Sequence, residues 1–156
     1  ALAGGTKAVE QFGHPGVNDS KGCGGVMRSA PFGWLSNREN HDWIYEQACE
    51  AAGYTHGHPT GKVASGALAY LIANIMDGQE LLHAVASTIA FLQTQQHSHE
   101  TVDALEMAIH LAEDVKGSRE TLENLGAGWI AEEALAISIY AALCFPGREH
   151  AIQVGR

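Results

Sequence analysis

Residues 101–117, TVDALEMAIHLAEDVKG, contain the clearest periodic pattern in the chain. Apolar side chains recur there every three or four residues and form one stripe, made of Val102, Leu105, Ile109, Ala112 and Val115. The acidic side chains on the opposite face are Asp103, Glu106 and Glu113. This spacing predicts an α-helix that packs one face against a core. The helix is expected to begin near Ser98 and to end at Gly117.

The same periodicity predicts helices along most of the chain. They are expected over 25–35, 41–53, 62–77, 79–96 and 129–145. In the second of these, the residues expected to face the core are Trp43, Ile44 and Ala48. In the fourth they are Leu82, Val85, Ala86, Ile89 and Leu92. The helix over 62–77 is apolar on nearly every side, so we expect neighbours all around it, at the centre of the fold.

Strand signals are almost absent, because no stretch alternates apolar and polar residues between turns. A chain of 156 residues with 46% hydrophobic residues can bury one ordinary core. The sequence therefore predicts an all-α protein, a compact multi-helix bundle in a single domain over residues 1–156. A helical fold by itself indicates no chemistry, so function has to be argued from particular residues.

Charge and cysteine content limit the partners. The formal charge of −9 gives no positive surface for nucleic acid or anionic lipid, so we expect neither partner. The longest apolar stretch, at 63–76, is shorter than the roughly 20 residues of a membrane span. No signal peptide is visible. Three cysteines without CxxC spacing favour a reducing compartment, and we expect a cytoplasmic protein.

A glycine-rich stretch, NDSKGCGGVMRSAP at 18–31, leads into one of the expected helices. Backbone N–H groups at a helix start are free to bind an anion, so the stretch is a candidate phosphate or diphosphate loop. Ser20 adds a hydroxyl, Gly24 and Gly25 allow close approach, and Arg28 either compensates charge or holds a neighbouring loop. A simple tight turn is the alternative. Neither the P-loop nor the dinucleotide-binding pattern fits.

Two further stretches contain polar residues of interest. In YTHGHPTGK, at 54–62, His56 and His58 suggest a metal site, a sugar pocket or simple packing at a helix start. The QQHSHE stretch at 95–100 raises the same metal question and is expected to be a solvated loop. In GAGWIAEEAL, at 126–135, Glu132 and Glu133 suit acid–base chemistry or the first turn of a helix, and we favour the structural role.

Taken together, NDSKGCGGVMRSAP, THGHPTG and GAGWIAEEALAISIYAAL resemble successive signatures of the ADP-ribosylglycohydrolase family. The resemblance covers nearly the whole chain and implies an all-α fold in which the glycine loop wraps the diphosphate and ribose of ADP-ribose. It also implies that His56 contacts the nucleotide sugar. Cys23 stands where relatives often have asparagine, and Lys21 stands where they have an aromatic residue. The ligand-binding residues implied on this basis are Ser20, Gly22, Cys23, Gly24, Gly25 and His56.

The resemblance also concerns metal chemistry. Family members bind two magnesium ions with acidic motifs on both sides of the segment present here, and neither motif is found in this sequence. We therefore expect a bundle of the family type truncated at both ends, with no catalytic residue and no metal ligand of its own. Asp19 and Glu132 do not replace the missing carboxylates.

Three functions remain open at this stage. The first is the family's hydrolysis of glycosidic bonds in ADP-ribosylated substrates. The second, which we prefer for this chain, is a catalytically incomplete module that binds ADP-ribose or ADP-ribosylated protein weakly. The third is an interaction module that self-associates, because apolar surface left bare at 63–76 or 129–140 would favour a homodimer.

Overall fold

Helices make up the architecture of the part of the chain that the structure describes. The computed structural model describes residues 16–114 and 119–145. Across these residues the chain forms helices and no strand, which confirms the all-α prediction. The elements are η2 (Val26–Arg28), α2 (Ala30–Gly33), α3 (His41–Gly53), α4 (Pro59–Met76), α5 (Leu81–Leu92), α6 (His99–Asp114), α7 (Arg119–Glu123) and α8 (Ala131–Cys144).

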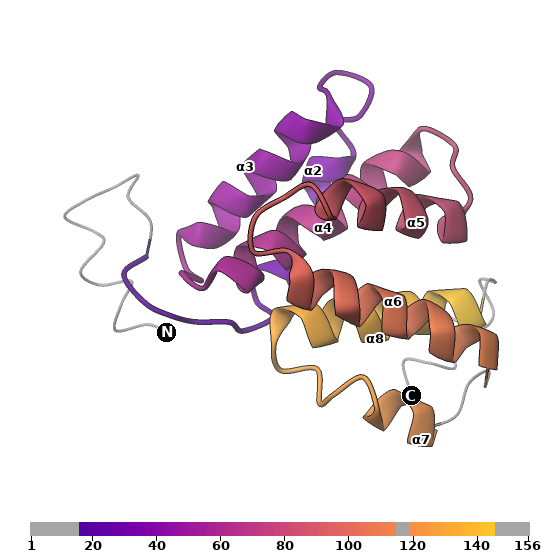
Figure 1. Ribbon diagram of the computed structural model, residues 1–156. Helices are drawn as coiled ribbons and strands as arrows, with labels where there is room; N and C mark the ends of the chain where they lie inside the picture. Colours follow the sequence, from indigo (N-terminus) through magenta and orange to yellow (C-terminus); the bar gives the residue numbers. More distant parts are fainter. Residues whose placement is uncertain (1–15, 115–118, 146–156) are drawn as a thin grey trace.

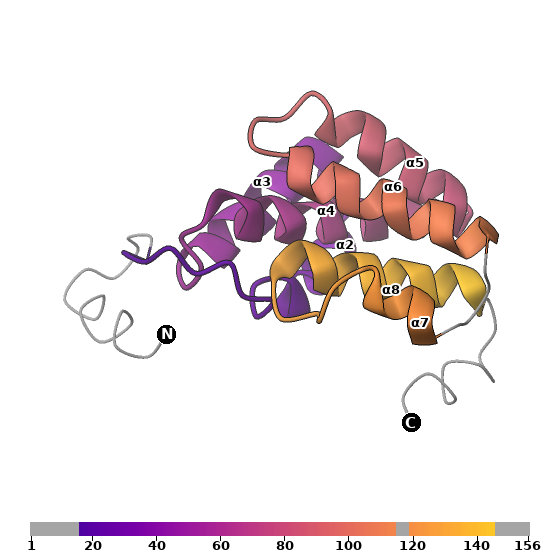
Figure 2. The same ribbon diagram turned by 60° about the horizontal axis from the view of Figure 1, so that its bottom comes forward.

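Helix α4 lies at the centre of the fold, as its apolar sequence predicts. It packs against η2, α2 and α3 on one side and against α5, α6 and α8 on the other. Helices α6 and α8 lie side by side and form the second layer (Figures 1 and 2). The core between the layers includes Leu71, Val85, Leu105, Leu135 and Tyr140, all buried.

Local capping fixes where the two central helices begin. The Asn40 side chain accepts a hydrogen bond of 2.7 Å from the Trp43 amide at the start of α3. At α4 the His58 ring accepts one of 3.2 Å from the Thr60 amide, and Pro59 occupies the first turn, where its missing N–H costs nothing. Helix α4 therefore begins at Pro59, earlier than the predicted Lys62.

Two predicted core faces are partly wrong. In α5, Leu82 and Ala86 are exposed, whereas Ala84 and Thr88 are buried with Val85. The face turned inward is the one that meets α4 and α6, and small residues fit that contact. In α3, Trp43 is exposed while Ile44 and Ala48 are fully buried, as predicted.

The helix predicted over 25–35 is broken into η2 and α2. Pro31 has no N–H to donate to the carbonyl of Met27, so a continuous helix cannot pass this point.

The short helix α7 was not expected. The predicted positions of Val115 and Gly117 in the 101–117 helix lie outside the described residues, and α6 ends at Asp114.

The apolar surface expected on 63–76 is largely absent, because residues 63–74 are buried or half-buried by their neighbours and exposure is confined to Ile75 and Met76. None of the helices in ranges 16–114 and 119–145 is both long enough and apolar enough to cross a membrane.

Candidate functional site

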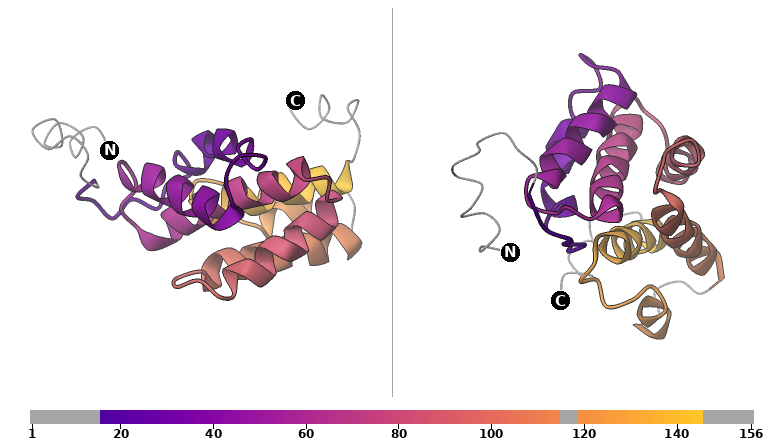
Figure 3. Two further views of the ribbon diagram at one scale, coloured as in Figure 1. Left: turned by 90° about the horizontal axis from the view of Figure 1, so that it is seen from above. Right: turned by 60° about the vertical axis from the view of Figure 1, so that its left-hand side comes forward.

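The glycine loop, residues 18–25, lies between the first turn of α4 and the start of α8 (Figure 3, right). The carbonyl of Ser20 accepts a hydrogen bond from the His58 amide at 3.3 Å, and the carbonyl of Lys21 accepts one from the Ala131 amide at 2.9 Å. The Cys23 amide donates to the carbonyl of Trp129 at 3.1 Å. Gly22 and Ile130 form an isolated antiparallel bridge. Main-chain bonds thus join the loop to two distant segments.

The amides of Gly24 and Gly25 donate to no acceptor within the described ranges. These two amides belong to the helix start at which the sequence predicts free backbone donors. Residues 20–24 are half-buried, so the loop reaches the surface, while Gly25 is buried. A Cβ atom on Gly25 would lie 2.8 Å from the Ser65 hydroxyl and 3.1 Å from the Ala52 Cβ. Gly25 therefore allows the loop to approach α3 and α4 closely.

The His56 ring lies across the glycine loop. A Cβ on Gly24 would lie 3.0 Å from Cε1 of this ring and 3.1 Å from Nε2. The Nδ1 atom is 2.7 Å from the Thr55 hydroxyl. Burial, and secondarily the charge of Arg28, lowers the pKa of His56 below its ordinary 6.5, so the imidazole is neutral at pH 7. The structure thus brings His56 next to the glycine loop, while the ligand contacts implied for these residues stay predictions.

Two neighbours hold the loop and the His56 turn together. The Asn18 Oδ1 accepts hydrogen bonds from the Ser20 amide at 2.9 Å and from the Gly57 amide at 3.1 Å, and its Nδ2 donates to the Thr55 carbonyl at 3.2 Å. The Arg28 guanidinium donates to the Thr55 hydroxyl. Of the two roles predicted for Arg28, charge compensation or holding a neighbouring loop, the structure shows the second. Asn18 was missed, although its position two residues before Ser20 suits an Asx turn.

An ion network beneath the loop was also missed. The Lys21 ammonium lies 2.9 Å from Glu100 on α6 and is paired with Glu132 on α8. The Thr60 hydroxyl donates to Glu100. Burial by itself would lower the pKa of Lys21, but its hydrogen bonds to Glu132 and Glu100 raise it above the ordinary 10.5. No local pattern indicates this network, because its members are about 30 to 110 positions apart in the sequence.

The network makes stability depend on pH in a defined direction. Thr60 and then Lys21 hold the pKa of Glu100 below its ordinary 4.5. The contribution of Glu100 is therefore complete above pH 4.5 and is lost as the pH falls through the lower folded-state value. The Lys21 contribution is complete below pH 10.5 and is lost as the pH rises through the higher folded-state value.

We therefore expect Glu100→Gln to lower the free energy of unfolding by about 1 kcal/mol or less near pH 7, because 38% of this side chain is exposed. The loss should shrink as the pH falls below 4.5 and vanish once the pH is below the folded-state pKa of Glu100, where the wild-type side chain is protonated. Urea unfolding over a series of pH values from about 7 downward measures this change. Glu106→Gln, an exposed change on the same helix, should show no such pH dependence. A loss that stays constant as the pH falls would contradict this pH dependence.

Comparison with protein families decides what kind of protein this is. The family described as ADP-ribosylglycohydrolase matches residues 2–154. The chain belongs to this family. Searches of curated proteins and of solved structures gave no match. The resemblance seen in the sequence is thus confirmed over nearly all of the ADP-ribosylglycohydrolase chain.

The two magnesium ions of the ADP-ribosylglycohydrolase family do not fit the residues described here. No group of three or more His, Cys, Asp or Glu side chains in ranges 16–114 and 119–145 is arranged to hold a metal ion. Glu100 and Glu132 already share the Lys21 ammonium, and His58 caps α4. Glu133 accepts a hydrogen bond of 3.1 Å from the Gly128 amide. These side chains have structural partners, so we assign no metal-dependent step to them.

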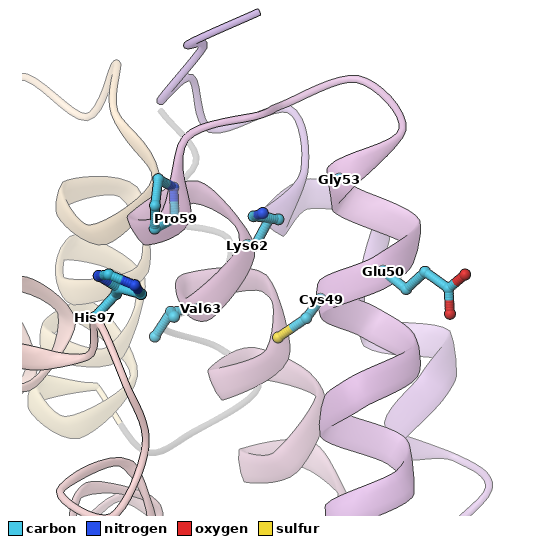
Figure 4. A pocket seen from close by; sticks show the side chains of 7 residues that line it. All are labelled: Cys49, Glu50, Gly53, Pro59, Lys62, Val63 and His97. Atoms are coloured by element: carbon cyan, nitrogen blue, oxygen red, sulfur yellow. The ribbon is translucent and has the colours of Figure 1, made fainter. Parts of the chain in front are cut away.

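A separate surface pocket of about 370 Å³ borders the other face of the first turn of α4. Its lining comes from α3, α4 and the α5–α6 loop, and consists of Cys49, Glu50, Gly53, Pro59, Lys62, Val63 and His97 (Figure 4). The Glu50 side chain points away from Val63 and His97 in this view. Burial raises the pKa of the Cys49 thiol to about 11, so it is not a nucleophile at neutral pH. The walls are mainly apolar, which does not suit a diphosphate.

Proposed function

We propose that this member of the ADP-ribosylglycohydrolase family binds ADP-ribose, free or attached to protein, through the glycine loop. The observation that supports this most is that the amides of Gly24 and Gly25, in a loop whose preceding residues reach the surface, have no acceptor among residues 16–114 and 119–145. Unpaired amides bind phosphate oxygens well. The Arg28 guanidinium, close enough to influence His56, adds positive charge beside them.

The proposed ligand also has an aromatic base, and Trp129 offers a surface for it. Its carbonyl is bonded to the Cys23 amide, so its backbone is fixed beside the loop, yet 79% of the residue is exposed. An indole face can stack on a purine, and such stacking contributes about 1–3 kcal/mol per base in other nucleotide-binding sites. In this proposal the loop amides bind the diphosphate, Ser20 and His56 contact the ribose, and Trp129 contacts adenine.

We further propose that residues 1–156 bind this ligand without hydrolysing it, because the acidic motifs that bind magnesium in the family are not among them. Calorimetric titration with ADP-ribose should then give saturable heat that magnesium does not change. Adenosine, which lacks the diphosphate, should bind at least about tenfold more weakly. Release of ADP-ribose from a modified protein on adding magnesium would contradict the second part of the proposal.

A pair of variants tests the charge beside the loop. Arg28→Met should weaken ADP-ribose binding by about tenfold, a loss typical of one charge-assisted contact. Arg38→Met, an exposed change between α2 and α3, should leave the affinity unchanged. Equal affinity for ADP-ribose in wild type and Arg28→Met would show that Arg28 is not part of the binding site. If titration of wild type with ADP-ribose gives no heat of binding, the proposed function itself is contradicted.

Self-association is a second candidate, favoured by exposed apolar side chains at the loop. Met27 and Trp129 are both largely exposed, and both backbones are hydrogen-bonded to Cys23. A second copy is one partner that would cover such a surface. Light scattering across concentrations should then show a homodimer that Trp129→Ser converts to a monomer. A monomer at every concentration contradicts it.

A further inference from the structure

The lysine in the middle of the glycine loop is bonded to the protein itself. Its ammonium group is paired with two carboxylates, Glu100 from α6 and Glu132 from α8. These two carboxylates neutralise its charge, which leaves little of it for a ligand phosphate. Lys21 therefore acts on the protein rather than on the ligand.

The burial of Glu132 makes its ion pair with Lys21 costly to break. Only 9% of its side chain is exposed, and its Oε2 atom is buried without a hydrogen-bond partner in the described ranges. Lys21 is the cation paired with the other oxygen. A buried carboxylate that loses its cation is strongly unfavourable, so the Lys21 side chain is held in one place.

Lys21 lies three residues before Gly24, in a loop whose main chain is bonded over residues 20–23 to His58, Trp129 and Ala131. The amides of Gly24 and Gly25 have no acceptor in the described ranges. The direction of these two amides depends on the bonded residues that precede them and on the turn that follows, where the Gly25 carbonyl accepts hydrogen bonds from the Arg28 amide and the Ser29 hydroxyl. Of these preceding residues, Lys21 alone forms an ion pair within the described part of the chain.

We propose that Lys21 is a positioning residue, which ties the glycine loop to α6 and α8 so that the amides of Gly24 and Gly25 are directed at the ligand. This inference rests on the proposed function for its binding consequence. Its structural consequence, a loop tied to α6 and α8 by the Lys21 side chain in addition to its main-chain bonds, is independent of ligand. Both can be measured.

The first measurement is amide exchange by NMR in Lys21→Met, which keeps an unbranched side chain one atom shorter than lysine and removes its charge. Exchange of the Cys23 and Ala131 amides, which bond across the loop, should become at least about tenfold faster than in wild type. Helix α5 amides should be unchanged. Lys62→Met, on α4 and without an ion pair in the described residues, is the matched control and should change neither. Unchanged exchange at Cys23 and Ala131 in Lys21→Met overturns the proposal.

The second measurement separates positioning from simple neutralisation of Glu132. The double variant Lys21→Met/Glu132→Gln leaves no buried charge without a cation, because Glu100, which also loses Lys21, is 38% exposed. It should therefore unfold at nearly the wild-type temperature even if the single variant folds poorly. Its Cys23 and Ala131 amides should still exchange fast, and its affinity for ADP-ribose should still be at least about tenfold below wild type. Lys21→Arg should restore most of both properties.

The outcomes distinguish the two proposals. Recovery of slow exchange and of affinity in the double variant would mean that Lys21 only neutralises Glu132, which overturns the positioning role. If wild type binds no ADP-ribose, the function fails, while the exchange measurement still decides the role of Lys21. If wild type binds ADP-ribose and both the single and the double variant bind it as tightly as wild type does, the function stands and the positioning role fails.

Discussion

Gly57→Ala is expected to destabilise the protein by about 3 kcal/mol or more and to weaken ADP-ribose binding by at least about tenfold. A methyl group here would fall inside the van der Waals radius of the Asn18 carbonyl oxygen and 3.2 Å from the carbonyl oxygen of Gly16. Both are backbone atoms, so no side-chain rotation relieves the clash. The His56 turn and the glycine loop would have to separate, which breaks the hydrogen bond between the Gly57 amide and Asn18.

Urea unfolding and calorimetry with ADP-ribose measure the two effects. Gly61→Ala is the matched control, because the nearest atom to its added methyl group would be the Ser20 carbonyl oxygen at 3.5 Å, an ordinary contact. Gly61 lies inside α4, where alanine is favoured over glycine by up to about 1 kcal/mol. Its stability should equal or exceed that of wild type. Equal stability in Gly57→Ala and Gly61→Ala would show that the two segments are not in close contact.

Leu105→Ala should cost about 2–5 kcal/mol of unfolding free energy. The residue is 1% exposed on α6 and belongs to the core shared with α8, so truncation leaves a cavity that the neighbouring helices cannot close. Leu82→Ala removes the same atoms from a side chain that is 49% exposed, and should cost within about 0.5 kcal/mol. Thermal and urea unfolding of both variants measure these losses of unfolding free energy. A loss of similar size at both positions would contradict the assigned core faces.

The sequence predicted the helices well and the faces of some of them poorly. Helix α3 has the predicted bounds, His41–Gly53, and its start coincides with the Asn40 cap found in the structure. In α5 the apolar residues surround much of the helix, so periodicity could not choose between the face with Leu82 and Ala86 and the face with Ala84 and Thr88. That choice depends on where α4 and α6 lie, which is a property of the whole fold.

The candidate site was predictable only where its residues are close in sequence. The glycine loop and His56 were found from local patterns, and their roles as ligand contacts remain predictions. Lys21, Glu100 and Glu132 gave no such signal, since an ion network across three elements is formed by packing. Glu100 lies in a stretch expected to be a solvated loop, and the tertiary contact with Thr60 and Lys21 changes its role.

The bridge between Gly22 and Ile130 has a consequence for the order of folding. It closes a loop of more than a hundred residues, and long loops of this kind form late because their closure costs the most chain entropy. A partly folded chain that retains only the contact between α3 and α4 would lack the proposed ADP-ribose site altogether. ADP-ribose would then select for the complete native state, and by mass action it would raise the melting temperature of the whole protein rather than of one segment.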